Sequence, residues 1–135
     1  MADTKVFAWI GNDRNHSLNV QIGLNGKVTT LGESSNTGPA IARFKNLYYL
    51  AWTGTDGSPN YATSADGVVW SEAETLTGEK ASSPSLAVSP DGGTIYLGWT
   101  GTDGRLNYVS STGGTFGGKQ TIDQTSPYAY CLLDV

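Results

Sequence analysis

One combination of aromatic, carboxylate and amide side chains occurs three times in this sequence of 135 residues. It is spelled "AWIGND" at residues 8–13, "AWTGTDG" at 51–57 and "GWTGTDG" at 98–104, and an asparagine follows each copy. An aromatic face can stack on the C–H surface of a pyranose, while carboxylate and amide oxygens accept hydrogen bonds from neighbouring hydroxyl groups. The repeated combination therefore indicates a set of equivalent sugar-binding sites.

The candidate ligand-binding residues lie within these phrases or shortly after them. They are Trp9, Asp13, Trp52, Thr55, Asp56, Asn60, Tyr61, Trp99, Thr102, Asp103, Arg105, Asn107 and Tyr108. A structural role is the competing interpretation, in which the tryptophans pack between sheets and the aspartates hydrogen-bond within their own loops. Weak sites repeated on one molecule gain avidity for a multivalent surface, by about 10²–10⁴, and this gain favours binding.

Repetition also argues against catalysis. An active site needs a few unlike groups that converge once, such as an acid, a base and a nucleophile. Glycosidases place two carboxyl groups about 5–10 Å apart, whereas Glu72 and Glu74 are expected on the solvated face of one strand. We therefore expect no catalytic residue. His16 has no His or Cys close to it in the sequence, so we also expect no metal site and no cofactor.

The repeated phrase marks three units that together account for the whole chain. Trp9, Trp52 and Trp99 are separated by 43 and 47 residues, and joining the end of the chain to its start gives 45 for the third interval. A proline that precedes an apolar run recurs at intervals of 45 and 43 residues. Periods of this length are typical of repeat architectures.

Each unit has the pattern of four short strands. In the second unit the strands are "GPAIARF", "LYYLAW", "NYATS" and "VVWSEAETL". Glycine occurs 18 times and only 15% of residues are charged, a composition typical of an all-β protein rich in turns. The pairs Asn25-Gly26, Asp66-Gly67 and Gly113-Gly114 separate the last two strands of each unit. Such pairs predict two-residue type I′ hairpins.

The ends of the chain are expected to complete one unit. The sequence starts on a second strand and stops after a first one, so the units are 1–37 plus 127–135, 38–82 and 83–126 of a single domain. Four-stranded units of this kind are the blades of a β-propeller, which typically has about four to eight of them. Three blades per chain therefore predict a homodimer that forms one six-bladed ring. A β-trefoil, which also has three repeats, is the alternative fold.

The repeat resembles the sialidase-like β-propeller repeats of bacterial, lectin-like proteins. "SADGVVW" at 64–70 is similar to the Asp-box of that superfamily, one residue shorter, with Ser64, Asp66, Gly67 and Trp70 at the matching places. The resemblance implies that the face ringed by the repeated loops carries the ligand site. Sialidase catalysis would require an arginine cluster for the substrate carboxylate, and the only arginines are Arg14, Arg43 and Arg105.

Composition limits the expected partners. The net charge is -4 and there is no basic cluster, so neither nucleic acid nor an anionic membrane is expected. No stretch approaches the roughly 20 apolar residues of a membrane-spanning helix. The N-terminus lacks a signal-peptide pattern, which predicts a cytoplasmic or non-classically exported protein. Cys131 lies among apolar residues and is expected to be a buried thiol.

The expected function is therefore that of a non-enzymatic, lectin-like protein whose partner is a glycan. A structural or protein-interaction module with the same fold is the alternative. A degenerate sialidase-like glycosidase is the third hypothesis.

Overall fold

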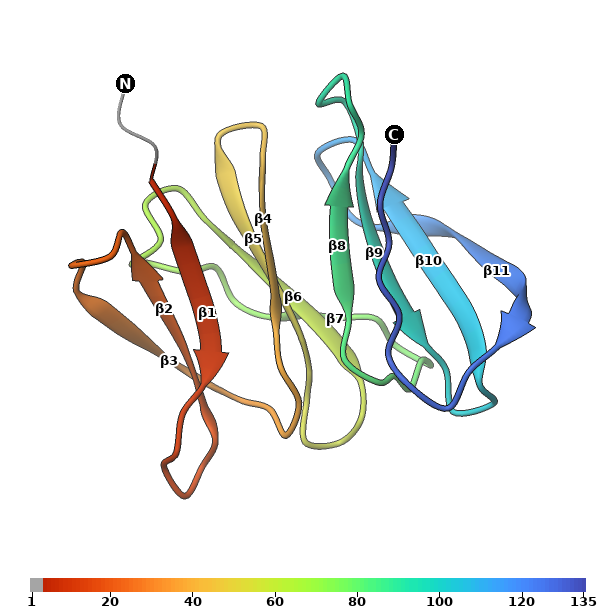
Figure 1. The fold of residues 1–135 in the computed structure, drawn as a ribbon, viewed down its shortest axis with the longest axis horizontal. Helices are drawn as coiled ribbons and strands as arrows, with labels where there is room; N and C mark the ends of the chain where they lie inside the picture. The colour runs from red at the N-terminus through yellow and green to blue at the C-terminus, as the bar shows by residue number, and fades with distance from the viewer. Residues whose placement is uncertain (1–3) are drawn as a thin grey trace.

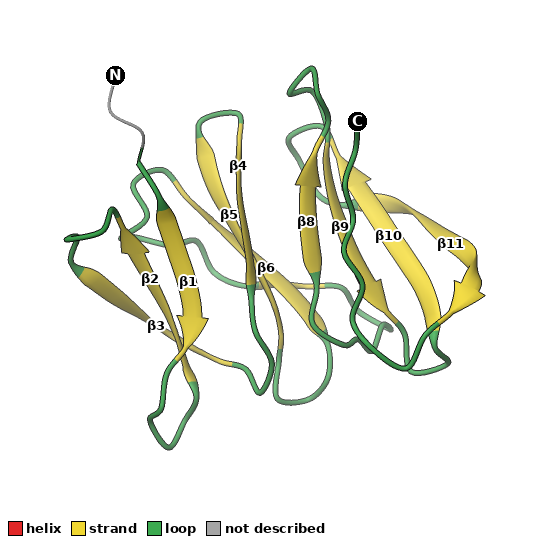
Figure 2. Ribbon diagram, in the orientation of Figure 1, coloured by secondary structure: helices red, strands yellow, loops and turns green. Residues whose placement is uncertain are grey.

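The chain folds into three antiparallel β-sheets that follow one another along the sequence (Figures 1 and 2). The computed structural model describes residues 4–135, and every regular element in that range is a strand. Sheet 1 contains β1 (Val6–Ile10), β2 (Ser17–Ile22) and β3 (Val28–Ser34). Sheet 2 contains β4 (Ala40–Phe44), β5 (Leu47–Thr53), β6 (Pro59–Ser64) and β7 (Glu74–Thr75). Sheet 3 contains β8 (Ser85–Val88), β9 (Ile95–Thr100), β10 (Arg105–Ser111) and β11 (Gly117–Thr125).

Every sheet is a meander in which each strand pairs with the next strand of the chain. The connection between β4 and β5 is a two-residue turn with positive φ at both Lys45 (48°) and Asn46 (67°), as a type I′ turn requires. The sequence predicted type I′ turns at Asn25-Gly26, Asp66-Gly67 and Gly113-Gly114, and that prediction is wrong. The connections β2–β3, β6–β7 and β10–β11 are longer than two residues, and at Asp66-Gly67, for example, only Gly67 has a positive φ, of 79°.

The fourth strand of sheet 2 is much shorter than the sequence predicted. Only Glu74–Thr75 pairs with β6, although "VVWSEAETL" was expected to be one strand. The preceding turn takes the backbone groups that a strand would use, because Asp66 Oδ1 accepts the N–H groups of Val68 at 2.9 Å and Val69 at 3.0 Å. These amides therefore belong to a compact turn, and both valine side chains are exposed.

The sheets pack face to face and bury a tryptophan at each junction. Between sheets 1 and 2, Leu18 and Val20 pack with Leu50, Trp52 and Ala62. Between sheets 2 and 3, the buried cluster comprises Phe44, Tyr49, Ala51, Tyr61, Ile95, Leu97, Trp99 and Val109. Alternate residues of β5 thus serve two different cores, which explains why the second strand of sheet 2 is apolar on both faces.

Sheet 1 has three strands, whereas sheets 2 and 3 each have four. Residues 127–135 form no strand in the chain and run along sheet 3 instead of beside β1 (Figure 1). Tyr130 Oη donates a hydrogen bond to the Asn107 carbonyl at 2.5 Å. Tyr130, Leu132 and Asp134 are the half-buried members of this segment, so the intervening Cys131 points outward. The expectation of a buried thiol is therefore wrong, since Cys131 is exposed.

Candidate functional site

The repeated phrase forms the connections β1–β2, β5–β6 and β9–β10, and its aspartates close these loops from within. In each loop the aspartate Oδ1 accepts, at 2.9 Å, a backbone N–H at or just before the next strand: Asp13 from Ser17, Asp56 from Ser58 and Asp103 from Arg105. The hydroxyl of Ser17 lowers the pKa of Asp13, and the N–H of Ser58 lowers the pKa of Asp56. The carboxylates of Asp13 and Asp56 are therefore ionised, and all three aspartates already accept hydrogen bonds within their own loops.

The asparagines after the phrase connect each loop to the last strand of its sheet. Asn60 Nδ2 donates to the Ser58 carbonyl at 3.0 Å, and Asn60 Oδ1 accepts a hydrogen bond from Thr75 Oγ1. Asn107 Nδ2 donates to the Arg105 carbonyl at 3.1 Å and its Oδ1 accepts from Thr121 Oγ1 at 2.8 Å. Asn19 makes the same two bonds in sheet 1. A sugar bound at these amides would have to replace bonds that hold the sheet together.

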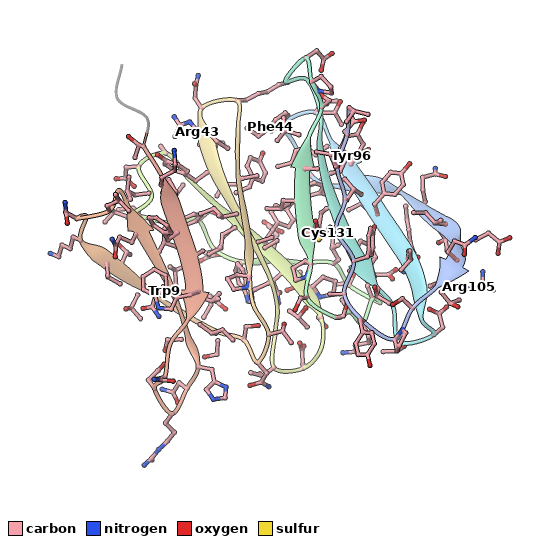
Figure 3. All side chains as sticks on the ribbon, in the orientation of Figure 1. Trp9, Arg43, Phe44, Tyr96, Arg105 and Cys131 are labelled. Atoms are coloured by element: carbon pink, nitrogen blue, oxygen red, sulfur yellow. The ribbon has the colours of Figure 1, made fainter. Side chains whose placement is uncertain are left out.

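The tryptophans of the second and third copies lie inside the protein. Trp52 is 1% exposed and Trp99 is 0% exposed. Neither therefore presents a free ring face on which a pyranose could stack from solvent. Trp9 is half-buried on sheet 1 (Figure 3). The packing role that competed with sugar stacking accounts for Trp52 and Trp99.

The remaining predicted residues are divided between the loop tips and the sheet faces. Thr55 and Thr102 are exposed at their loop tips. The Arg105 guanidinium is also exposed, with its Nε 3.7 Å from Asp103 Oδ2. Tyr108 lies on the face of sheet 3 that points away from sheet 2, edge to face with Tyr96 at a centroid distance of 5.9 Å. The structure thus does not gather the thirteen predicted residues into one pocket.

Tyr61 and Trp99, however, meet in a cleft between sheets 2 and 3. The cleft has a volume of about 300 Å³. It is lined by Tyr61, Glu74, Thr75, Leu76, Thr77, Glu79, Trp99, Val109, Thr115, Phe116 and Lys119. Strands β6 and β7 supply one wall, and β9, β10 and the β10–β11 connection supply the other. Its size falls at the lower end of the range for small-molecule pockets.

An unsatisfied donor lies in the wall of this cleft. Trp99 Nε1 is buried and has no hydrogen-bond acceptor, a property it shares with only one other buried side-chain atom of residues 4–135, Thr37 Oγ1. Buried polar groups are nearly always paired, and an unpaired one costs about 1–3 kcal/mol. The indole N–H of Trp99 is therefore a donor that no group of the described protein satisfies.

Charged and aromatic groups surround this donor. Lys119 Nζ lies 2.9 Å from Glu79 Oε1 across the cleft, which joins β11 to the segment after β7. The rings of Tyr61 and Phe116 meet edge to face with centroids 4.9 Å apart. Burial raises the pKa of Tyr61, and the negative charge of Glu74 raises it further. The cleft thus combines carboxylate acceptors, an ammonium donor, an indole donor and aromatic surface.

A second cleft of the same kind lies between sheets 1 and 2. It has a volume of about 270 Å³ and is lined by Thr29, Thr30, Leu31, Gly32, Glu33, Val68, Trp70 and Ser71. Thr30 and Thr75 occupy equivalent positions, because each donates to the asparagine of its own sheet. Thr29 therefore replaces Glu74 here, and counting back five residues from Thr75 and Thr121 shows that Trp70 replaces Phe116. The second cleft repeats the position of the first, but Glu33 is the one charged residue in its lining.

Sequence reasoning missed most of the cleft between sheets 2 and 3. Glu74 was placed on a solvated strand face, and Glu79, Phe116 and Lys119 were not considered. Their side chains come from two different units, and only the packing of sheet 2 on sheet 3 brings them together. One signal was present in the sequence: Trp70 and Phe116 are aromatic residues at the same place in consecutive units.

Arg43 and Arg105, two of the arginines that a sialidase-type site would need, belong to different sheets. Arg43 stacks over the Tyr48 ring at 4.5 Å in sheet 2, while Arg105 lies at the far end of sheet 3 (Figure 3). Within residues 4–135 there is no group of three His, Cys, Asp or Glu side chains that could hold a metal ion. The same range contains no helix long and apolar enough to span a lipid bilayer.

Comparison with known proteins identifies the fold. No protein-family model and no curated protein matches the sequence. The structure is similar to that of a fucose lectin from Kordia zhangzhouensis, solved in complex with methyl-fucoside, with a TM-score of 0.63. The match covers 91% of this chain and 92% of the lectin chain, at 14% sequence identity. The chain therefore has an all-β fold that is also found in a lectin.

Proposed function

We propose that this protein is a non-enzymatic lectin that binds a glycan in the cleft between sheets 2 and 3. The unsatisfied indole N–H of Trp99 carries the proposal, because a sugar hydroxyl or ring oxygen would supply the acceptor that the protein lacks. Glu74 and Glu79 provide acceptors for sugar hydroxyls, and Lys119 provides a donor. Hydrogen bonds to such charged groups are stronger than neutral ones.

The similarity to a fucose lectin supports a deoxysugar as the ligand to test first. Fucose combines a methyl group and several hydroxyls on one ring, so it needs apolar and polar surface within one small site. The cleft offers both, with Leu76, Val109 and Phe116 beside the carboxylates and the lysine. A cleft of about 300 Å³ suits one sugar residue better than a long oligosaccharide.

The repeated loops then have a supporting role. Their aspartates and asparagines fix the hairpins, and the hairpins hold Trp52 and Trp99 at the sheet junctions. We place the binding sites between the sheets because Trp52 and Trp99 have no free face at the loops. The second cleft is a weaker site of the same kind, since it lacks equivalents of Glu74 and Lys119.

The proposed function also includes an assembly, in which two copies of the chain form one β-propeller. Three meander sheets stacked in chain order have the arrangement of consecutive blades, and propellers contain about four to eight of them. Two chains would give six blades, with the clefts repeated around one ring. Linked weak sites of this kind increase the affinity for a multivalent glycan surface.

Titration of the purified protein with methyl fucoside, followed by a glycan array, tests this function. Replacing Trp99 by Phe keeps an aromatic side chain in the core but removes the N–H, so we expect affinity to fall about tenfold or more, which corresponds to about 1.4 kcal/mol. Trp52→Phe is the matched control, because it makes the same change at the other junction. If the folded protein bound no glycan on the array, the proposal that it is a lectin would be refuted. Unchanged affinity in the Trp99→Phe variant would refute this location.

A further inference from the structure

We propose that the C-terminal segment of each chain is the missing first strand of sheet 1 in a second copy, so that two chains close the ring by exchanging strands. This inference rests on the six-bladed ring of the proposed function but not on the glycan. It decides a point that the sequence left open, namely whether the first blade closes within one chain or between two.

A repeated hydrogen bond identifies the segment as a first strand. Thr53 and Thr100 each follow the tryptophan of the repeated phrase. Thr53 Oγ1 donates to the Ser82 carbonyl at 2.6 Å, and Thr100 Oγ1 donates to the Tyr128 carbonyl at 2.7 Å. Ser82 lies three residues before β8, the first strand of the sheet that packs on sheet 2. The segment from Cys131 onward therefore lies where the first strand of a fourth sheet would begin.

The rest of this fourth sheet is what sheet 1 of another chain would supply. Sheet 1 lacks the strand that corresponds to β4 and β8, and β1 forms its edge. A groove of about 550 Å³ lies beside that edge, with Val6 of β1 on one side and Ile41, Ala42 and Tyr48 of sheet 2 on the other. At the other end of the molecule Leu133 is 82% exposed. One chain thus has an empty strand position and an unpaired strand, at opposite ends.

The two end faces of the chain also match each other. Sheets 2 and 3 each have one face that packs on the sheet before them in the chain, and on this face Trp52 and Trp99 lie in buried cores. The same face of sheet 1 carries Phe7, which is 39% exposed, and the half-buried Trp9. Spacing from the tryptophans makes Phe7 equivalent to the buried Leu50 and Leu97. The opposite end face of sheet 3 carries Tyr96 (Figure 3), with Tyr108 edge to face beside it. These two tyrosines are the equivalents of the buried Tyr49 and Tyr61. A second copy would continue a packing that the chain already makes twice.

The existing pairing of β8 with β9 gives the register of the exchanged strand. Ser85, Leu86 and Val88 lie opposite Gly98, Leu97 and Ile95. Taking Tyr128 as the equivalent of Ser82, and Trp9 as the equivalent of Trp99, places three residues of one chain opposite three of the other: Cys131 opposite Ala8, Leu132 opposite Phe7, and Asp134 opposite Lys5. The register therefore pairs apolar residues with each other and an acid with a base, which stabilises antiparallel strands.

The segment cannot fill the empty position in its own chain in this structure. Sheet 2 lies between sheets 1 and 3, and the segment is held on sheet 3 by the hydrogen bonds of Tyr128 and Tyr130. Gly98 provides the space for this contact, because a Cβ there would lie 2.9 Å from Cζ of Tyr130. Ala51 and Ala8 occupy the equivalent positions in sheets 2 and 1. Exchange with one further copy gives both chains a complete first sheet.

Disulfide trapping tests the register in the full-length protein. The A8C variant places a thiol opposite the native Cys131 of the second chain, so mild oxidation should give a covalent dimer on a non-reducing gel. The matched control is F7C, whose side chain points to the other face of β1 and should remain uncrosslinked. Wild-type protein should have twice the 14.2 kDa mass of one chain. A single-chain mass at micromolar concentration, or equal crosslinking of both variants, would overturn the proposal.

A pair of exposed leucines provides a second test that does not depend on folding of an altered core. Leu133 is 82% exposed and Leu24 is 76% exposed in the chain, so replacing either by Asp leaves the single chain folded. L133D should reduce the native mass to that of one chain, whereas L24D should leave it unchanged. A dimer that binds no sugar would support strand exchange and refute only the lectin. Methyl-fucoside binding by a protein of single-chain mass would refute only the exchange.

Discussion

Tyr61 and Phe116 meet edge to face across the junction of sheets 2 and 3, with ring centroids 4.9 Å apart and ring planes at 83°. Tyr61 belongs to β6, and Phe116 lies in the connection before β11. Phe116 also contacts Tyr49 edge to face at 6.2 Å. Phe116 thus packs the β10–β11 connection against two strands of sheet 2 at one wall of the cleft.

Replacing Phe116 by Ala should open this wall. Phe116 is half-buried, so the loss of unfolding free energy should be about 1–2 kcal/mol rather than the roughly 3–5 kcal/mol of a fully buried phenylalanine. Affinity for methyl fucoside should fall as well, because the sugar loses apolar surface. Thermal unfolding and calorimetric titration of the same sample measure the two effects. Phe116→Leu is the control and should recover most of the stability.

Gly98→Ala should release the C-terminal segment from sheet 3. The added methyl group would collide with the Tyr130 ring, whereas alanine is already present at the equivalent position of sheet 2, Ala51. We expect faster cleavage near residues 127–135 by a nonspecific protease and a weaker dimer. Gly114→Ala is a suitable control, since a Cβ there meets no atom within 4 Å. Identical cleavage of both variants would contradict this account of Gly98.

The attachment of the segment should also weaken at high pH. Burial raises the pKa of Tyr130 from 10.0 to about 12. Between these values the unfolded chain loses the phenolic proton while the folded chain keeps it, so the stability that this group contributes is complete below pH 10 and is lost as the pH rises toward 12. Spectrophotometric titration should show a tyrosine that titrates near pH 12 and is absent from Tyr130→Phe, and native mass measured over the same range should report dissociation.

The repeat pattern predicted most of the fold because its signals are local. The period gave the three units, and the strand pattern of the second unit located β4, β5 and β6. The shortening of the fourth strand was not predictable from propensity, since Asp66 captures two backbone amides that the valine-rich sequence would otherwise give to a ladder. Side-chain chemistry in the turn thus outweighed the β propensity of Val68 and Val69.

The site was harder to predict than the fold. The sequence indicated the repeated tryptophans as exposed surfaces on which a sugar could stack. Trp52 and Trp99 are instead buried, because each lies on a sheet face that packs against a neighbouring sheet. Glu74 and Lys119 lie far apart in the sequence and become neighbours through the packing of one sheet on the next. No spacing rule within one repeat connects them. Only the recurrence of aromatic residues at Trp70 and Phe116 pointed to the sheet junctions.

Exchanging residues between the two clefts should show which groups make a glycan site. Glu74→Thr gives the cleft between sheets 2 and 3 the residue that the other cleft has at Thr29, and Lys119→Ala gives it the residue found at Ala73. Glu74 is exposed and the Lys119 side chain is 43% exposed, so both changes should leave thermal stability within about 0.5 kcal/mol of wild type. Each should reduce the affinity for methyl fucoside at least about fivefold, because a charged partner contributes about 1.5–3 kcal/mol when it hydrogen-bonds a ligand.

Glu72→Gln, on the same segment but outside the cleft lining, is the control and should bind normally. Equal affinity of the Glu74→Thr and wild-type proteins would show that the carboxylate does not contact the sugar, and would leave the indole N–H of Trp99 as the group on which recognition depends.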